Sequence, residues 1–263
     1  MKTTNVSLVY FSATYTTRKI VRTVAKQFEG TNSEYDITQN IPKQQITLEN
    51  TDLLVLGVPV YAGRVPETTL SALNQFKGND TPAVIVCVYG NRDYDDALLE
   101  LKDIVENNGF KVISAGAFIA QHSIFPKVGL NRPDEKDIAE IEKFGAQSAS
   151  LLKSISEVSS LKGVTVKGNN PYKAPGKIPL HPKGNKNCNE CGTCVTLCPA
   201  QAISADKPRN TDNSKCIVCS RCVVVCPQHA RKFGGMLYKP VGWLFTKANS
   251  ERKEPFTTYA SFQ

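Results

Sequence analysis

Cysteine is almost absent from the first 187 residues of this 263-residue chain, which contain only Cys87. The sequence also lacks an apolar run of the roughly 20 residues that a membrane span needs, because Lys239 and Pro240 interrupt its most apolar late stretch, 234–245. The first ten residues have no apolar run behind a basic start, as a secretory signal would. We therefore expect a cytoplasmic protein without a membrane span, whose cysteines do not form disulfides.

Acidic residues are scarce in the second part of the chain. Residues 1–160 contain 16 Lys and Arg against 19 Asp and Glu, a net charge of −3, whereas residues 161–263 contain 16 against 5, a net charge of +11. A basic region attracts acidic partners, but this one has no dense arginine-rich run and no recognisable nucleic-acid module. We expect no nucleic-acid binding. We also expect the two parts to dock through opposite charges, and salt to weaken that docking.

Apolar runs alternate with amphipathic ones through the first 160 residues. Five runs predict strands: 6–11, 34–37, 53–60, 83–89 and 112–119. Helical spacing predicts helices at 16–28, 67–76, 98–108 and 134–152. Strands that are apolar on both faces and separated by helices indicate a parallel sheet covered on both sides. The sequence therefore predicts an α/β fold with a doubly wound, five-stranded parallel sheet in residues 1–160.

Three further segments follow this predicted domain. Residues 161–186 are rich in Gly, Pro, Lys and Asn, and they contain Pro171, Pro175, Pro179 and Pro182. Because proline fixes the backbone, we interpret them as a semi-rigid linker. A cysteine-rich domain is expected at 187–232 and a tail at 233–263.

Eight of the nine cysteines fall within 39 residues and form a repeat. The pattern C-x2-C-x2-C-x3-C-P begins at Cys188 and recurs from Cys216, with each ligand shifted by 28 residues. This spacing places consecutive thiolates around one iron–sulfur cube, and the fourth cysteine of such a repeat serves the partner cluster. One cluster is therefore assigned Cys188, Cys191, Cys194 and Cys226, and the other Cys198, Cys216, Cys219 and Cys222.

The repeat resembles that of bacterial two-cluster ferredoxins, where a proline follows each fourth cysteine, as Pro199 and Pro227 do here. The resemblance implies a small α+β domain with two [4Fe-4S] clusters. Structural zinc is the alternative, because paired CxxC elements also bind zinc. Zinc pairs usually have a longer gap between their two halves. Cys87 lies in an expected strand and is interpreted as a buried apolar side chain.

Hydroxyl side chains fill the turn between the first expected strand and the helix that follows. They are Ser12, Thr14, Thr16 and Thr17, with Tyr15 among them. Hydroxyls and free amides at a helix N-terminus suit a phosphate dianion. A simple helix cap is the other interpretation, although one Ser or Thr would be enough for it.

Two more loops follow the third and fourth expected strands. Their candidate residues are Pro59, Val60, Tyr61, Ala62 and Gly63 in one loop, and Tyr89, Gly90, Asn91, Arg92 and Tyr94 in the other. All three loops lie at carboxyl ends of parallel strands, so they are expected to face one crevice.

With these loops the chain resembles flavodoxin and, over nearly its whole length, the EFR1-type flavodoxin-ferredoxin fusions of anaerobic bacteria. Asn91-Arg92 and Arg132-Pro133 belong to this resemblance. It implies FMN in the crevice, with its phosphate held by the hydroxyl turn and its ring between the other two loops, stacked on Tyr61 or Tyr94. Flavodoxin phosphate loops usually have glycine at the place of Tyr15. A side chain there either weakens the site or becomes a contact of its own.

The resemblance also implies electron transfer, because clusters carry one electron whereas FMN accepts one or two. We favour a carrier that relays electrons between the clusters and FMN for a partner redox enzyme. The alternative is an FMN-dependent reductase of a small molecule, fed by its own ferredoxin domain. The crevice offers no clear acid–base pair beyond His122 and tyrosines. Arg64 and Arg92 either stabilise a reduced flavin or are solvated loop charges.

Overall fold

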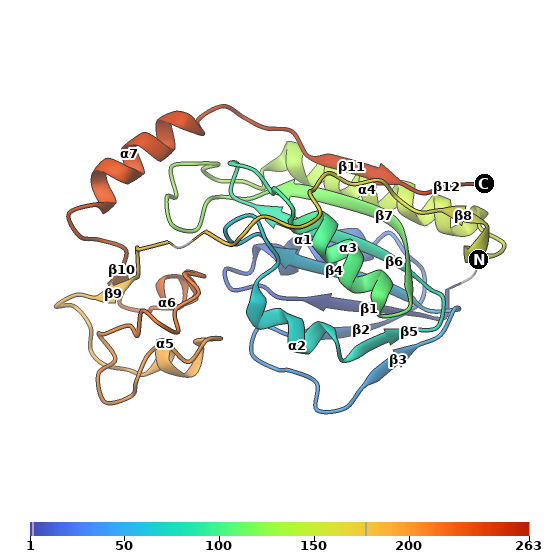
Figure 1. Ribbon diagram of the computed structural model, residues 1–263. Helices are drawn as coiled ribbons and strands as arrows, with labels where there is room; N and C mark the ends of the chain where they lie inside the picture. Colours follow the sequence, from blue (N-terminus) through green and yellow to red (C-terminus); the bar gives the residue numbers. More distant parts are fainter. Residues whose placement is uncertain (2, 177, 263) are drawn as a thin grey trace.

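The computed structural model describes residues 1, 3–176 and 178–262. Lys177, in the expected linker, and Gln263, in the expected tail, lie outside the described residues, as does Lys2. A layered α/β domain lies beside a small module that contains the cysteine repeat (Figure 1). Among the described helices, none is long and apolar enough to cross a membrane.

A six-stranded sheet with the order β11-β7-β6-β4-β1-β2 forms the centre of the larger domain. Five strands run parallel: β1 (Asn5–Tyr10), β2 (Thr31–Asp36), β4 (Leu53–Pro59), β6 (Thr81–Tyr89) and β7 (Phe110–Ile119). Their order is that of the flavodoxin-like doubly wound fold, which confirms the predicted fold class. The sixth strand, β11 (Phe256–Tyr259), comes from the end of the chain and pairs antiparallel with β7. The expectation of only five strands is corrected here.

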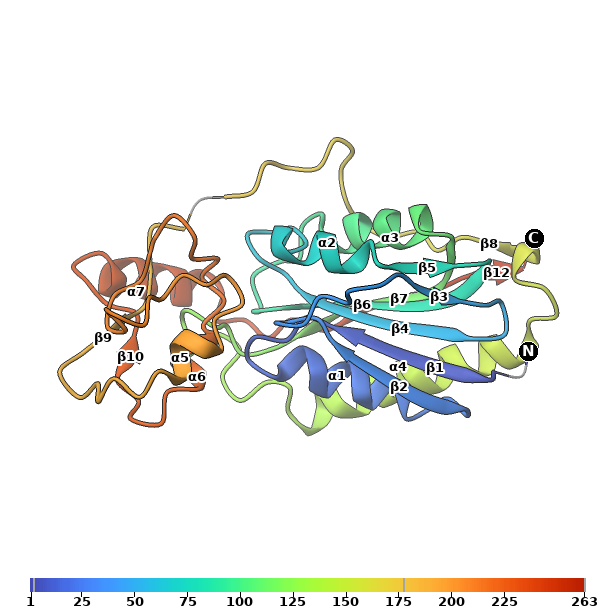
Figure 2. The same cartoon turned by 90° about the horizontal axis from the view of Figure 1, so that it is seen from below.

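Helices cover both faces of this sheet (Figure 2). One face carries α1 (Thr16–Ala25) and α4 (Glu135–Ser154), and the other carries η1 (Glu67–Thr69), α2 (Leu70–Leu73) and α3 (Ala97–Asn107). The expected helix at 67–76 ends early, because β5 (Phe76–Gly78) pairs with β3 (Ile46–Leu48). A short η2 (Val158–Ser160) follows α4.

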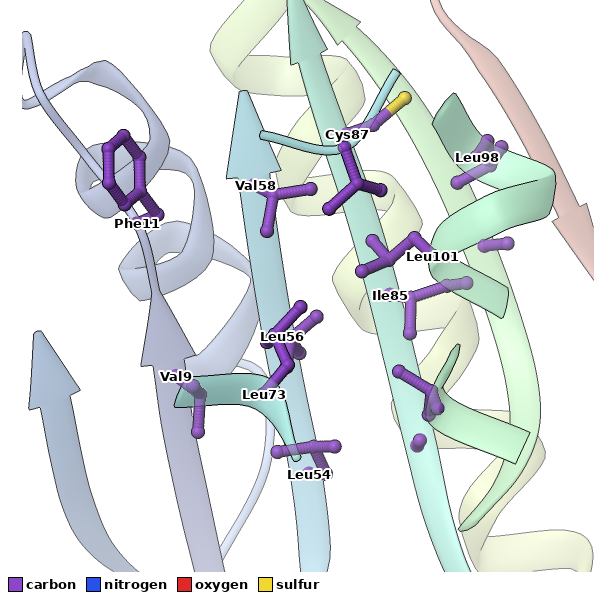
Figure 3. Close-up of a cluster of buried hydrophobic side chains, with 14 of the residues drawn as sticks. Val9, Phe11, Leu54, Leu56, Val58, Leu73, Ile85, Cys87, Leu98 and Leu101 are labelled. Atoms are coloured by element: carbon purple, nitrogen blue, oxygen red, sulfur yellow. The ribbon is translucent and has the colours of Figure 1, made fainter. Parts of the chain in front are cut away.

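A core lies on each face of the sheet, one where the central strands meet α2 and α3 and the other where they meet α1 and α4. Figure 3 shows part of the first, contributed by β1, β4, β6 and the helices α2 and α3: Val9, Phe11, Leu54, Leu56, Val58, Leu73, Ile85, Cys87, Leu98 and Leu101. Cys87 has no exposed surface, and burial raises the pKa of its thiol well above the usual range. Its interpretation as an apolar core residue is confirmed.

The segment expected to be a linker packs against the larger domain. Its start, β8 (Leu161–Lys162), pairs with β12 (Ser261–Phe262). Further along, the backbone N–H of Asn169 donates to the Asp96 carboxylate at 2.9 Å, and that of Lys173 donates to it at 2.7 Å. The expected tail likewise contains α7 (Tyr238–Ala248) before β11. Both segments therefore make more contacts than the sequence indicates, while the domain boundaries stay predictions.

The cysteine module is small and mixed, as expected. It contains the antiparallel pair β9 (Lys183–Gly184) and β10 (Arg231–Lys232) and two short helices, α5 (Thr193–Thr196) and α6 (Arg221–Val224). Each helix begins between the second and third cysteine of its repeat.

Candidate functional site

The eight cysteines of the repeat gather around two cavities. The first cavity is lined by Cys188, Cys191, Cys194 and Cys226. The second is lined by Cys198, Cys216, Cys219 and Cys222. Each cavity thus combines three cysteines of one segment with the fourth of the other, which is the grouping that the repeat predicts.

Each of these cavities has a buried arginine in its wall. Arg231, only 1% exposed, borders the first cavity and donates to the carbonyls of Pro208 (2.6 Å) and Pro182 (2.8 Å). Arg221, 6% exposed, borders the second. The Nε of both arginines lacks an acceptor among the described residues. An unpaired buried donor costs about 1–3 kcal/mol, so these donors and the cysteine set fit an anionic iron–sulfur cluster in each cavity.

Burial acts against free thiolates in the second cavity. It raises the pKa of the Cys219 thiol to about 12 and that of Cys222 to about 11, and the nearby Arg231 cation offsets the rise at Cys222 only in part. Thiolates at these positions therefore need further positive charge beside them, which bound metal supplies.

In the hydroxyl turn after β1 the backbone changes direction at Tyr15. Tyr15 precedes the first residue of α1 and has φ 67°, in the left-handed region that favours glycine. Ser12 is buried, and its Oγ accepts a hydrogen bond from the N–H of Arg18 at 3.0 Å. It therefore acts as a local cap, while Thr14, Thr16 and Thr17 line a cavity at the N-terminus of the helix.

This third cavity is where the strand-end loops converge. Its lining comes from the hydroxyl turn (Ala13, Thr14, Thr16, Thr17), from the other two predicted loops (Pro59, Val60, Tyr61, Tyr89, Gly90), and from Ala120, Gln121, His122, Ser123 and Cys219. Residues 120–123 follow β7, so the strand-end rule that identified the other loops would also have found them. Cys219 had no sequence signal, because its position here depends on how the cysteine module packs.

The residues that line the third cavity suit FMN chemically, but the volume of the cavity is small. Threonine hydroxyls and the start of α1 suit a phosphate, and Tyr61 suits a flat aromatic ring. The cavity encloses about 70 Å³, whereas ligand pockets usually measure roughly 300–1,000 Å³. A flavin ring therefore requires the loops around Tyr61 and Cys219 to move apart.

Comparison with protein families gives a match for each part of the chain. Residues 7–111 match a flavodoxin domain, and residues 187–231 match a 4Fe-4S dicluster domain. The chain is a flavodoxin-ferredoxin fusion. A dicluster domain with eight cysteines suggests two [4Fe-4S] clusters, a flavodoxin domain suggests FMN, and both domains imply electron transfer.

Several solved structures with similarity to the fusion are flavodoxins. A flavodoxin from the domain Archaea shares 12% identity over 57% of this chain and 99% of its own, with a TM-score of 0.41. A short-chain flavodoxin associated with a non-canonical PDU bacterial microcompartment shares 16% over 59% and 100%, with a TM-score of 0.40. A mutant flavodoxin of Fusobacterium nucleatum bound to flavin mononucleotide shares 15% over 60% and 96%, with a TM-score of 0.36. A search of curated proteins finds no match.

Tyr15 joins the two domains of the fusion. Its ring lies under the guanidinium of Arg18, at 4.8 Å, and under that of Arg221 from the ferredoxin domain, at 4.4 Å. Arg221 Nη1 also donates to the Ala13 carbonyl at 3.1 Å. A side chain in place of glycine was expected either to weaken the phosphate site or to make a contact itself. The Tyr15 ring does make such a contact, with the two arginines.

The remaining residues predicted for the flavin site lie elsewhere in the fusion. Tyr94 is 7% exposed and packs against Tyr89 and Phe256, at ring distances of 5.5 and 6.1 Å. Asn91 donates to the carbonyls of Asn249 and Glu251, so it holds the segment after α7. The structure does not bring these residues to the cavity, nor does it bring Ser12, Tyr15, Ala62, Gly63 and Arg92.

The two loop arginines of the flavodoxin domain have carboxylate partners. Arg64 makes two hydrogen bonds of 2.8 Å to Glu100, and Arg92 pairs with Asp95. Both therefore belong to ion pairs, and the Arg92 side chain is 41% exposed.

His122 lines the third cavity and has a structural hydrogen-bond pattern. Its Nδ1 accepts from the N–H groups of Ile124 and Phe125 at 3.2 and 3.1 Å. Burial, together with the charge of Arg92, lowers the pKa of His122 to about 4. The ring is neutral near pH 7, as suits a loop residue that accepts hydrogen bonds.

Proposed function

We propose that this fusion is an intracellular electron carrier that relays electrons between two [4Fe-4S] clusters and FMN for a partner redox enzyme. FMN accepts one or two electrons and each cluster accepts one, so FMN and the clusters together convert between one-electron and two-electron transfer. The observation that carries the proposal is the position of Cys219. This residue lines the second cysteine cavity and also the cavity formed by Thr14 and Tyr61.

The lining of each cavity supports the following ligand roles. The four cysteines around each of the first two cavities hold one cluster, and Arg231 and Arg221 place buried cations beside them. Thr14, Thr16 and Thr17 hold the FMN phosphate. Tyr61 packs beside the ring and excludes water there, and burial of its hydroxyl raises the pKa of Tyr61 well above its usual value.

The first cysteine cavity is suited to exchange with a partner. Each cavity has two buried cysteines, but the first also has an exposed one, Cys191, whereas the remaining two of the second, Cys198 and Cys216, are only half-buried. A partner would therefore exchange electrons at the first cavity, and the second cavity connects it with the flavodoxin domain. We propose an acidic partner, because the net charge of residues 161–263 is +11 before cofactors are counted.

The test is a measurement on the anaerobically purified holoprotein. We expect about eight iron and eight sulfide per chain and about one FMN per chain. We also expect that electrons delivered to the clusters by a fast one-electron donor reach the flavin within a single molecule, at a rate independent of protein concentration. A protein that lacks flavin, or one whose flavin is reduced only in bimolecular encounters, would contradict the proposal.

A second candidate function, reduction of a small molecule, is favoured by one further cavity. It encloses about 870 Å³ between the domains and includes Tyr61, Arg64, Glu67, Asn213, Ser214 and Cys216 in its lining. Rapid, saturable reoxidation of the reduced protein by a small oxidant, without any second protein, would favour this reductase over a carrier.

A further inference from the structure

Helix α7 carries apolar side chains on two opposite faces. Its inner face packs on the loop after β7, where Phe125 lies 5.5 Å from the ring of Tyr238 and 5.1 Å from that of Phe245. Its outer face, together with the two residues just before the helix, presents five large apolar side chains, which together are named the outer face of α7. They are Met236 (94% exposed), Leu237 (61%), Val241 (41%), Trp243 (63%) and Leu244 (60%).

Three of these side chains form a stripe, and Trp243 lies about 100° further round the helix, between Lys239 and Lys247. Leu237, Val241 and Leu244 recur at the i, i+4, i+7 spacing that aligns side chains along one side of a helix. None of the residues of α7 is buried, and the helix stands at the edge of the molecule beside the ferredoxin domain (Figure 1). Exposed apolar patches of this kind mark interaction sites.

The charged side chains on α7 itself have one sign. Between Asp212 and Glu251 the chain has no acidic residue, and its exposed basic side chains are Lys215, Lys232, Lys239 and Lys247, whereas Arg221 and Arg231 are buried beside the cysteine cavities. The two on α7, Lys239 and Lys247, are exposed, and Lys247 Nζ lies 5.4 Å from the centre of the Trp243 ring. The surface therefore combines apolar side chains with a positive potential.

We infer that the outer face of α7 binds the surface of a membrane that contains anionic lipids. Short helices with Trp and Leu on one side and Lys beside them lie in the interfacial plane of bilayers, where tryptophan is favoured. Each lysine near an anionic surface adds attraction. With 11 residues, α7 is about 16 Å long, so it lies along the surface.

Other occupants fit this surface less well. In a two-fold dimer the patch meets itself, so Lys239 and Lys247 would face their own copies. Protein interfaces are enriched in Arg and depleted in Lys, whereas the basic residues of α7, Lys239 and Lys247, are both lysines.

Contacts with the loop after β7 hold α7 in a fixed position, so membrane binding through α7 also sets which part of the protein lies near the membrane. Tyr238 Oη donates to the Ile124 carbonyl at 2.9 Å, and a Cβ on Gly242 would lie 3.1 Å from the Phe125 ring. Phe245 packs on His122, at a ring distance of 4.8 Å, and His122 lines the third cavity. Binding through α7 therefore places the third cavity and the ferredoxin domain near the bilayer, whichever redox function is correct.

Sedimentation of the holoprotein with vesicles tests the inference. We expect binding to phosphatidylcholine vesicles that contain phosphatidylglycerol and at least about tenfold weaker binding to phosphatidylcholine alone. Trp243 is the only tryptophan of the chain, so quenching of its fluorescence by bromine-labelled lipid reports insertion of this face. Leu244→Glu should weaken binding about tenfold or more, because it removes apolar contact and adds repulsion.

The control variant is Ile41→Glu, which makes the same change at a side chain that is 50% exposed on the flavodoxin domain. It should bind vesicles like the wild type. Equal binding by Leu244→Glu and the wild type, no quenching of Trp243, or no binding to anionic vesicles would overturn the inference. The last result, together with a dimer that Leu244→Glu dissociates, would assign the face to a second copy of the chain.

Discussion

At the scale of single residues, Arg231 is the most informative side chain. It is almost fully buried at the first cysteine cavity, and its charge also acts on Cys222 of the second. It therefore places one fixed cation between two anionic sites. Because reduction adds negative charge to a cluster, a nearby fixed cation favours the reduced form.

We predict that Arg231→Met lowers the reduction potential of at least one cluster by roughly 50 to 100 mV, the equivalent of roughly 1 to 2 kcal/mol for one electron. Arg231→Lys is the matched control, because it retains the charge and should shift the potential much less. Redox titration followed by electron paramagnetic resonance measures both variants. Equal potentials in the wild type and Arg231→Met would show that the arginine is only structural.

The crossed cysteine grouping gives a second prediction at this scale. Cys198→Ser should damage the cluster whose other ligands are Cys216, Cys219 and Cys222, because Cys198 lines their cavity. Electron paramagnetic resonance should show the other cluster intact. Loss of the signal from the cluster that is nearest to Cys198 in sequence would reverse the assignment.

His122 makes the stability of the protein depend on pH. Its folded pKa of about 4 is below the unfolded value of about 6.5, so the unfolded chain binds a proton first as the pH falls. Stability is therefore lost between about pH 6.5 and pH 4, by roughly 1 to 3 kcal/mol. His122→Asn, compared with the wild type by thermal unfolding at pH 7 and pH 5, should lose less on acidification. An equal loss in both proteins would contradict this.

At the scale of elements, the central strands could be predicted and the last ones could not. Strands β4 and β6 are buried on both faces, so they appear in the sequence as unbroken apolar runs. Strand β11 has only four residues, two of them threonines, and it follows charged residues, so no local signal separates it from a tail. Helix α7 contains Pro240 and Gly242, which disfavour a helix in sequence-based reasoning.

In the candidate site, too, features with a local sequence signal could be predicted, and those that depend on distant contacts could not. The cysteine grouping was predictable because every spacing repeats. The hydroxyl turn was predictable because it follows a clear strand. The resemblance to flavodoxin implied that Tyr94 stacks on the flavin, but Phe256 of β11 packs on its ring, and that contact joins residues 162 positions apart. The place of Cys219 likewise depends on tertiary packing.

Strand β11 leads to a prediction about the isolated flavodoxin domain. A chain that ends at Ser160 should still fold and bind FMN, because the five parallel strands are all present. It should be about 2 to 4 kcal/mol less stable than the same chain rejoined to residues 250–263 by a short linker, since β7 loses its partner and Tyr94 loses Phe256. Denaturant unfolding and FMN titration measure both. Equal stability would show that β11 contributes nothing.

At the scale of the whole molecule, the two domains meet through buried contacts. Arg221 donates to the Ala13 carbonyl, and Ser220 Oγ donates to the Ser123 carbonyl at 3.0 Å. The sequence predicted docking through exposed charges that salt would screen. Salt screens exposed pairs far more than buried ones, so the structure changes that expectation.

We now predict that electron transfer between the clusters and FMN changes by less than about twofold from about 50 to about 500 mM salt. Arg221→Met should slow it markedly, because the contact with Tyr15 is lost. Gln39→Ala is the control, since Gln39 makes an exposed contact with the Thr196 carbonyl at 2.8 Å. Stopped-flow experiments measure the transfer rate of the wild type and of both variants. A steep fall of the wild-type rate with salt would favour docking by exposed charges.

The pairing of β8 with β12 has a practical consequence for attaching the protein to a surface. The chain is held on the sheet domain up to Lys173 and contacts it again from Asn249, so the ferredoxin domain is attached at both of its ends. Met1 and Phe262 then lie together at the end of the molecule remote from α5, α6 and α7 (Figures 1 and 2). An electrode or bead linked through either terminus would therefore be attached at the same end of the molecule. The cysteine cavities would face away from it, and no force would act across the contact between the domains.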